Sequence, residues 1–597
     1  MSRIHRLVAL VVLLLPCITV AARAQLTVPE RTRGERTSTH AEVLAFIDSL
    51  VHRGARMTIG TLGESPRGKR LPYVILSRPL VATPAAAKAS GKPLLYIEGN
   101  IHAGEVEGKE AVQMLMRDLT LGKLKPLLDS VIIIFVPIYN ADGNDALGPQ
   151  DINRGEQLGP EMVGLRANGQ GYDLNRDYVK QDAPETRASL ALVTKWDPDL
   201  FMDLHTTDGS YHGYALTWSP GLNPNHTPIN DWVTDTVLEQ VRKRLRERDH
   251  VETYPYGNFA YPRQAPGTTR DSTVMPIGWD TYEGFPRYGT NLAGMTRISI
   301  LSEAMSHDPF PRRIEATYDF ILESIRYLNE HKAEMRRHEA LAAKYRPDSV
   351  VIRTDSLRRS PARMDTVLVA VTRRVSMTRS DSVARANAPR TPTRPDTIGV
   401  CTPGGAGRGG RGQRGGGAPG AGAGGRNGGR GGAAGATREV EELTGVSHGV
   451  YMEVHDRFGA ARKEAIPAAY VFGSEFGKVV ELMRRQGIAV QKTTASWSGP
   501  VGHFAVDSVA RPGYFEGHCM TRVEGAWSAP AVDTIAAGSY LVSTNQRMGM
   551  LAAFLLEPAS EDGYTNWNFF DAALASHGVA PVKRLVRMPS IKLVAVP

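Results

Sequence analysis

The chain has 597 residues, of which 42% are hydrophobic and 22% charged, and its formal net charge is +9. This length permits two or more domains with substantial cores. Most of the positive excess comes from arginines in an N-terminal segment and in a glycine-rich tract, so the remainder is close to neutral. The net charge therefore does not indicate a nucleic-acid-binding surface, and we expect no nucleic-acid partner.

The N-terminal segment 1–24 is typical of a secretory signal peptide. A short basic stretch, MSRIHR, precedes the apolar run LVALVVLLL, and Ala22–Arg23–Ala24 has the small-x-small pattern of a cleavage site. We expect cleavage before Gln25 and export to the periplasm or the extracellular space. A membrane anchor is the alternative interpretation, although the run is short for a span. No later run approaches roughly eighteen apolar residues, so we expect no stable membrane insertion after cleavage.

Residues 25–336 have the pattern of an α/β domain. Four continuous apolar runs have the length of strands: LLYIEGN, VIIIFVPIYN, DLFMDLH and RISILSE. Helical spacing, as in Val112–Leu115–Met116–Leu119, lies between them. Uninterrupted apolar strands predict a mixed, largely parallel sheet covered by helices on both faces, which binds ligands beyond the carboxyl ends of its strands. Four polar side chains stand at such ends, namely those of His102, Glu105, His205 and Glu303.

Three of these side chains form the donor set of a catalytic zinc. His102 and Glu105 lie in one turn, where we expect Gly104 to let the backbone bend tightly. His205 ends a distant strand, with Asp203 nearby as an acceptor for its imidazole N–H. A catalytic zinc takes three protein ligands, such as two histidines and a glutamate, and keeps one position open. The sequence therefore predicts one zinc ion per chain.

Five motifs follow one another in an order that resembles the zinc carboxypeptidase family. They are HAGE, PIYNADG, LRANGQGYDLNRD, DLHTTDG and ISILSEA. The resemblance covers roughly residues 40–330 and implies the fold of that family, with His102, Glu105 and His205 as zinc ligands. It also implies that Arg166 polarises the scissile carbonyl and that Glu303 is the general base. At NADG, NRDY and LSEA the sequence differs from the usual motifs of the family. These differences remove no ligand, but they leave the class of substrate open.

The resemblance implies a second group of residues that bind the substrate. Asn175 and Arg176 would hold its terminal carboxylate, and Tyr282, with Tyr288 as a rival, would close over it. From the residues alone, NRD also suits a capping turn in which Arg176 pairs with Asp177. Likewise, Glu303 alone suits a buried ion pair.

The function predicted from this set is a secreted metallocarboxypeptidase acting on the C-termini of peptides or proteins. A carboxylate free of the metal can take a proton from water and pass it to the departing nitrogen. A planar guanidinium binds a terminal carboxylate through two parallel hydrogen bonds. One alternative is a zinc amidohydrolase of the same fold that acts on acylated amino acids or cell-wall peptides. Another is a non-enzymatic binding protein that acts through the arginine–glycine tract.

The rest of the chain divides into three parts. Residues 337–402 form a basic connector in which SVVIR and TVLVAV suggest strands, and residues 403–437 are a flexible linker rich in Gly and Arg. Residues 438–597 predict a smaller α/β domain, which resembles the accessory C-terminal region of some bacterial members of the family. A disulfide between Cys401 and Cys519 is permitted in an oxidising compartment but is not fixed by the sequence.

Overall fold

The computed structural model describes residues 26–262, 274–355, 363–378 and 437–596. The predicted signal peptide and the linker up to residue 436 lie outside the described residues. Within the described ranges, no helix combines the length and apolar character that a membrane span requires.

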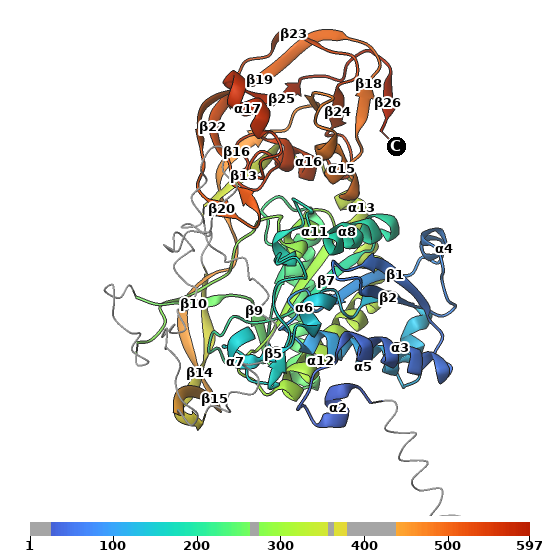
Figure 1. The fold of residues 1–597 in the computed structure, drawn as a ribbon, viewed down its shortest axis with the longest axis vertical. Coiled ribbons are helices and arrows are strands. Elements are labelled where there is room, and N and C mark those ends of the chain that lie inside the picture. The colour runs from blue at the N-terminus through green and yellow to red at the C-terminus, as the bar shows by residue number, and fades with distance from the viewer. Residues whose placement is uncertain (1–25, 263–273, 356–362, 379–436, 597) are drawn as a thin grey trace, which may run out of the picture.

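The larger half of the molecule is organised around an eight-stranded mixed sheet (Figure 1). In spatial order its strands are β1 (Thr58–Glu64), β2 (Arg70–Leu76), β4 (Ile132–Val136), β3 (Leu94–Gly99), β7 (Leu200–Thr206), β12 (Ile298–Ala304), β8 (Leu216–Pro220) and β9 (Thr253–Pro255). The four central strands, β4, β3, β7 and β12, run parallel to one another. They coincide with the four apolar runs of the sequence, so those strand predictions are confirmed.

Helices cover both faces of this sheet. One layer consists of α3 (His40–His52), α5 (Glu107–Thr120), α10 (Leu238–Arg248) and α12 (Phe310–Glu330), and the other includes α8 (Pro184–Trp196) and α11 (Gly289–Gly294). Side chains alternate between the two layers along each strand, because Leu95 and Ile97 face the first layer whereas Leu94 and Tyr96 face the second. The predicted mixed α/β sheet with helices on both faces is confirmed.

Shorter elements connect these strands and helices. They are α2 (Val28–Thr32), α4 (Pro84–Ala89), η1 (Lys125–Asp129), α6 (Ala141–Asp145), β5 (Gly148–Pro149), α7 (Gln150–Asn153), β6 (Met162–Val163), η2 (Leu174–Arg176), α9 (Pro228–Trp232), the π-helical turn η3 (Val233–Val237) and α13 (Lys332–Lys344). The 3-10 turn η2 matters most for the site, because it carries Asn175 and Arg176.

A long ribbon extends from the larger half. Its strands belong to a four-stranded sheet in the order β10 (Asn258–Ala260), β11 (Gly278–Asp280), β15 (Thr437–His455) and β14 (Arg363–Thr378). Strand β13 (Ser349–Asp355) pairs separately with β16 (Gly459–Ala465). The runs SVVIR and TVLVAV thus form β13 and part of β14. Strand β15, which the sequence analysis assigned to the C-terminal domain, pairs in parallel with β11 of the larger half.

The C-terminal unit, defined here as residues 466–596, is rich in β-structure. Its antiparallel sheet has the order β22 (Arg522–Trp527), β19 (Trp497–Ala510), β25 (Val579–Leu585), β17 (Ala469–Phe472), β24 (Tyr540–Ser543), β18 (Gln491–Thr493) and β26 (Leu593–Ala595), with β23 (Ala531–Ile535) beside β19. Its other elements are the hairpin β20 (Tyr514–Phe515) and β21 (His518–Cys519) and the helices α15 (Gly477–Arg485), α16 (Gly549–Leu556) and α17 (Asp571–His577). Cys519 is disulfide-bonded, and Cys401, the partner that the sequence permits, lies outside the described residues.

The C-terminal unit packs on the helix layer that contains α8 and α11, as Figure 1 shows. The apolar cores of the two halves are continuous there: Trp196 of α8 and Leu292 of α11 belong to the same buried cluster as Tyr564 and Trp567. The aromatic stretch DGYTNWNFFD, residues 562–571, therefore serves as core and interface.

Candidate metal centre

A sharp turn follows strand β3 and carries two of the candidate ligands. The backbone reverses at Asn100, a buried residue with φ of 70°, and the buried side chains of His102 and Glu105 follow before α5 begins. Gly104 lies outside the left-handed region. A Cβ at Gly104 would lie 2.6 Å from Cγ of Arg154, so the glycine provides room for that arginine. The expected tight turn is present, because the Glu105 N–H donates to the His102 carbonyl at 3.0 Å, but the glycine is needed there for space and not for an unusual backbone conformation.

The third candidate ligand, His205, comes from the neighbouring strand β7. Strands β3 and β7 are parallel, so their carboxyl ends meet at the same edge of the sheet. His205 Nδ1 lies 2.9 Å from Glu105 Oε2 and 3.2 Å from His102 Nδ1, and His102 Nδ1 lies 2.9 Å from Glu105 Oε1. One ligand atom from each residue falls within 4.8 Å of the others. The three predicted ligands therefore converge on one point.

The outer nitrogen of each imidazole is bound by a carboxylate. His102 Nε2 lies 3.0 Å from Asp173 Oδ1, and His205 Nε2 lies 2.8 Å from Asp203 Oδ2. These contacts direct both Nδ1 atoms toward Glu105. Zinc-binding histidines almost always donate their other N–H to such an acceptor. The donor set and its surroundings thus fit one zinc ion. The contact with Asp203 was expected from the sequence, and that with Asp173 was not.

Glu105 is kept ionised by its cationic neighbours. Its Oε1 accepts hydrogen bonds from Arg154 Nη1 at 3.0 Å and Arg166 Nη1 at 3.4 Å, while Oε2 accepts one from the Thr206 backbone. Burial alone would raise the pKa of Glu105, but His102 and Arg154 hold that pKa well below its usual range. A deprotonated carboxylate is the form that binds a cation. Nothing in the sequence around Arg154 marked it as part of the site.

Arg166 lies between the candidate ligands and solvent. Its Nε donates to Asp173 Oδ2 at 2.9 Å, and a third of its side chain is exposed. Although burial raises the pKa of Asp173, the charge of Arg166 and the contact with His102 hold it well below its usual range. Asp173 therefore stays anionic and fixes both the guanidinium and the imidazole. The predicted position of Arg166 beside the metal ligands is consistent with this geometry.

The turn η2 holds Asn175 and Arg176 close to the triad. Asp173 caps it by accepting a hydrogen bond from the Asn175 backbone at 2.9 Å. The guanidinium of Arg176 stacks 4.1 Å above the ring of Tyr288. Asp177 pairs with Lys180 at 2.6 Å, so the alternative in which Arg176 pairs with Asp177 is not observed. Arg176 pairs with Asp173 instead, because its Nη1 lies 4.0 Å from Asp173 Oδ2.

Glu303 stands at the end of β12, in register with His205 of the parallel strand β7. It is 7% exposed, and among the described residues its carboxylate accepts no hydrogen bond and forms no ion pair. Burial raises the pKa of Glu303 well above its usual range, and His205 opposes this effect. The buried ion pair considered as an alternative is not observed. A carboxylate beside the ligands but without a partner is suited to exchanging protons with a bound molecule.

Both candidate tyrosines belong to one aromatic cluster. The ring of Tyr282 lies 5.0 Å from that of Tyr256 and 5.5 Å from that of Tyr288. Tyr288 is already engaged, because it carries Arg176 on its ring and donates its hydroxyl to Glu283 at 2.7 Å. This arrangement favours Tyr282 as the residue that contacts substrate.

A buried carboxylate lies behind the triad. Glu98 of β3 accepts hydrogen bonds from the hydroxyls of Tyr96 at 2.6 Å and Tyr178 at 2.8 Å. Burial, with a contribution from Asp203, raises the pKa of Glu98 from 4.5 to about 8. The folded protein therefore retains this proton at pH values where the unfolded chain releases it.

We expect Glu98→Gln to flatten the dependence of stability on pH. In the parent, a carboxyl whose pKa is raised on folding makes the free energy of unfolding fall as the pH rises through the interval from its unfolded to its folded pKa. Glutamine does not titrate. The free energy of unfolding of Glu98→Gln should therefore lack this fall between about pH 5 and about pH 8. Urea unfolding of both proteins across this interval measures the effect. The exposed Glu475→Gln should keep the parent slope, and a parent-like slope in Glu98→Gln would contradict the expectation.

Comparison with known proteins identifies the relatives of this site. Residues 43–285 match a family model described as zinc carboxypeptidase. Carboxypeptidase 2 of Trichophyton equinum is 21% identical over 540 residues, which cover 89% of this chain and 81% of that protein. Carboxypeptidase D of Mus musculus is 28% identical over 254 residues, 38% of this chain and 18% of that protein.

Solved structures of carboxypeptidases also align with the chain. A metallo-carboxypeptidase from Burkholderia cenocepacia covers 50% of this chain and 70% of its own, with 15% identity and a TM-score of 0.36. The segment that matches the family model contains His102, Glu105 and His205 together with Arg166 and Arg176. The match confirms the family resemblance over residues 43–285, whereas the motif ISILSEA, which contains Glu303, lies beyond the matched segment.

Proposed function

Because residues 43–285 match a family model described as zinc carboxypeptidase, we propose that this chain removes residues from the free carboxyl ends of peptides or proteins. The observation that carries the proposal is the convergence of His102, Glu105 and His205 at the sheet edge where Glu303 lies without a partner. Arg176, stacked on Tyr288 nearby, supplies the anion-binding group that a chain end requires.

The triad would hold one zinc ion through two imidazole nitrogens and a carboxylate oxygen. When bound, zinc supplies Lewis-acid chemistry by polarising the carbonyl oxygen and activating water. Asp173 and Asp203 fix the orientation of the two imidazoles, and Arg154 fixes Glu105. The protein thus contributes a preformed set of ligands.

The remaining side chains act on the substrate. Glu303 takes a proton from the attacking water and passes it to the departing amine. Arg166 offsets the negative charge that develops on the carbonyl oxygen. Arg176 and Asn175 bind the terminal carboxylate, which places the last peptide bond beside Glu303. Tyr282 closes over the bound residue.

Matched peptides with free and amidated C-termini test this function. The purified protein should contain one zinc by elemental analysis and cleave the free-carboxylate peptides much faster than the amidated ones. His205→Ala should lack both the zinc and the activity. Equal cleavage of free and amidated peptides would contradict the carboxypeptidase proposal and favour the amidohydrolase alternative. Absence of zinc from the active parent would contradict the metal site.

The location of the protein is also a proposal. The basic, apolar and small-residue pattern of residues 1–24 supports export to the periplasm or the extracellular space. Peptide and protein ends in that compartment would be the substrates. A complete set of candidate ligands, base and arginines supports an enzyme over a non-enzymatic binding protein.

A further inference from the structure

A hairpin of the C-terminal unit reaches the turn that carries Asn175 and Arg176. Strands β20 and β21 form this hairpin, and Glu516 and Gly517 form its tip. We propose that Glu516 is a positioning residue, through which the C-terminal unit holds the catalytic turn Asp173–Arg176 in place. The proposal rests on the proposed function in so far as that turn binds the substrate carboxylate.

The contact joins the hairpin to a candidate metal ligand in two steps. The backbone N–H of Asp173 donates to Oε2 of Glu516 at 3.2 Å. The side chain of Asp173 in turn binds Nε2 of His102 and caps the turn through the Asn175 backbone. A displacement of Asp173 would therefore disturb both the imidazole that binds the metal and the arginine that follows Asn175.

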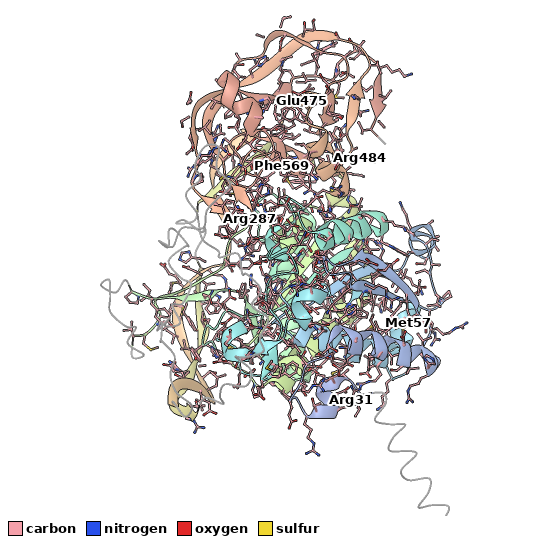
Figure 2. The ribbon with its side chains drawn as sticks, in the orientation of Figure 1. Arg31, Met57, Arg287, Glu475, Arg484 and Phe569 are labelled. Atoms are coloured by element: carbon pink, nitrogen blue, oxygen red, sulfur yellow. The ribbon has the colours of Figure 1, made fainter. Side chains whose placement is uncertain are left out.

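Other contacts dock the C-terminal unit independently of Glu516. Asp562 binds the backbone N–H and Nε of Arg287 at 2.8 and 2.9 Å, in a buried setting. Gln486 donates to the Tyr178 carbonyl at 3.0 Å. Figure 2 shows Arg287 where the two halves meet, below Phe569 of the C-terminal unit. Together with the continuous apolar core, these contacts hold the halves together, so the Glu516 contact is not needed for docking.

The backbone conformation at the hairpin tip gives a second, independent reason to assign a positioning role to Glu516. Glu516 has φ of 47° and Gly517 has φ of 93°. A two-residue hairpin turn with both φ values positive favours Asn or Gly, and a glutamate there is strained. Residues held in such conformations cluster at functional sites. A glutamate that adopts this conformation and directs its carboxylate to the catalytic turn indicates that the side chain is needed.

The decisive variant is Glu516→Gly in the full chain, because glycine relieves the strain while removing the carboxylate. We expect a melting temperature equal to or above that of the parent. Zinc affinity, measured by competition with a chelator, should fall about two- to tenfold, the range that one hydrogen bond supports. KM for peptides with a free carboxylate should rise by a similar factor. Glu516→Gln retains an acceptor oxygen, so its zinc affinity and its KM should both lie close to those of the parent.

The exposed Glu475→Ala, on the same unit but well away from Arg287 at the junction of the two halves, is the matched control (Figure 2). Zinc affinity and KM in Glu516→Gly that equal those of this control would overturn the proposal. A lower melting temperature with unchanged zinc affinity and KM would also overturn it, because Glu516 would then serve docking alone. The zinc measurement needs no substrate, so its outcome stays separate from any failure of the proposed peptidase function.

Discussion

Replacing Glu303 with glutamine should lower kcat by at least about a hundredfold, within the range found for the loss of a general base. Glutamine keeps the size of the side chain but cannot accept the proton of water. Since Glu303 makes no contact that holds a candidate ligand in place, zinc content and KM should change little. Steady-state kinetics and elemental analysis on the same preparation measure all three quantities.

A glutamate on the surface of α12 provides the matched control. Glu315 is exposed and pairs with Arg312 of its own helix, so Glu315→Gln should retain parent kinetics. Near-normal turnover in Glu303→Gln would place the base elsewhere. A large fall in kcat accompanied by loss of zinc would mean that Glu303 organises the ligands.

The fold of the larger half and the metal triad could be predicted because they follow from local patterns. Continuous apolar runs identify buried strands, and parallel strands bring their carboxyl ends to one edge. A polar residue directly after such a run is therefore placed without knowledge of any loop. His205 lies at the carboxyl end of β7, and His102 and Glu105 follow shortly after the end of β3, so the side chains of all three converge in the structure.

The supporting residues could not be predicted, because their partners lie far away along the chain. Arg154 reaches Glu105 across 49 residues, and Asp173 reaches His102 across 71. Arg154 and Asp173 both lie between α6 and η2, where β5, α7 and β6 are too short to give a periodic pattern that fixes the path of the chain. The same reason explains why the contact between Gly104 and Arg154 could not be predicted. The sequence neighbours of Gly104 suggested a tight turn, whereas the requirement for glycine comes from the side chain of Arg154.

Contacts between the larger half and the C-terminal unit are even harder to predict from the sequence. Glu516 and Asp173 are separated by 343 residues. Strand β15 begins after the glycine-rich tract and still pairs with β11 of the larger half. Apolar periodicity identified strands and helices in the C-terminal unit, but it carries no information about which outer surface meets another part of the chain. Only the folded arrangement reveals that this unit touches the catalytic turn.

The preference for chain ends should depend on Arg176. Truncating one partner of a buried, hydrogen-bonded charge pair costs about 2 kcal/mol or more, and 1.4 kcal/mol is about a factor of ten. Arg176→Ala should therefore lower kcat/KM for peptides with a free carboxylate at least about thirtyfold. Zinc content should stay at the parent level, because Arg176 contacts no candidate ligand: its guanidinium stacks on Tyr288 and donates to the Asn175 carbonyl.

Arg176→Lys separates charge from geometry. Lysine keeps a cation but cannot form two parallel hydrogen bonds with a carboxylate, so its kcat/KM should lie between those of the parent and the alanine variant. Amidated peptides lack the group that Arg176 binds, and whatever residual cleavage they undergo should be the same in all three proteins. An equal loss for free and amidated peptides would show that Arg176 supports the site through Tyr288 instead of binding the chain end. The ratio of the two substrate classes therefore identifies the ligand of Arg176 independently of the absolute rate.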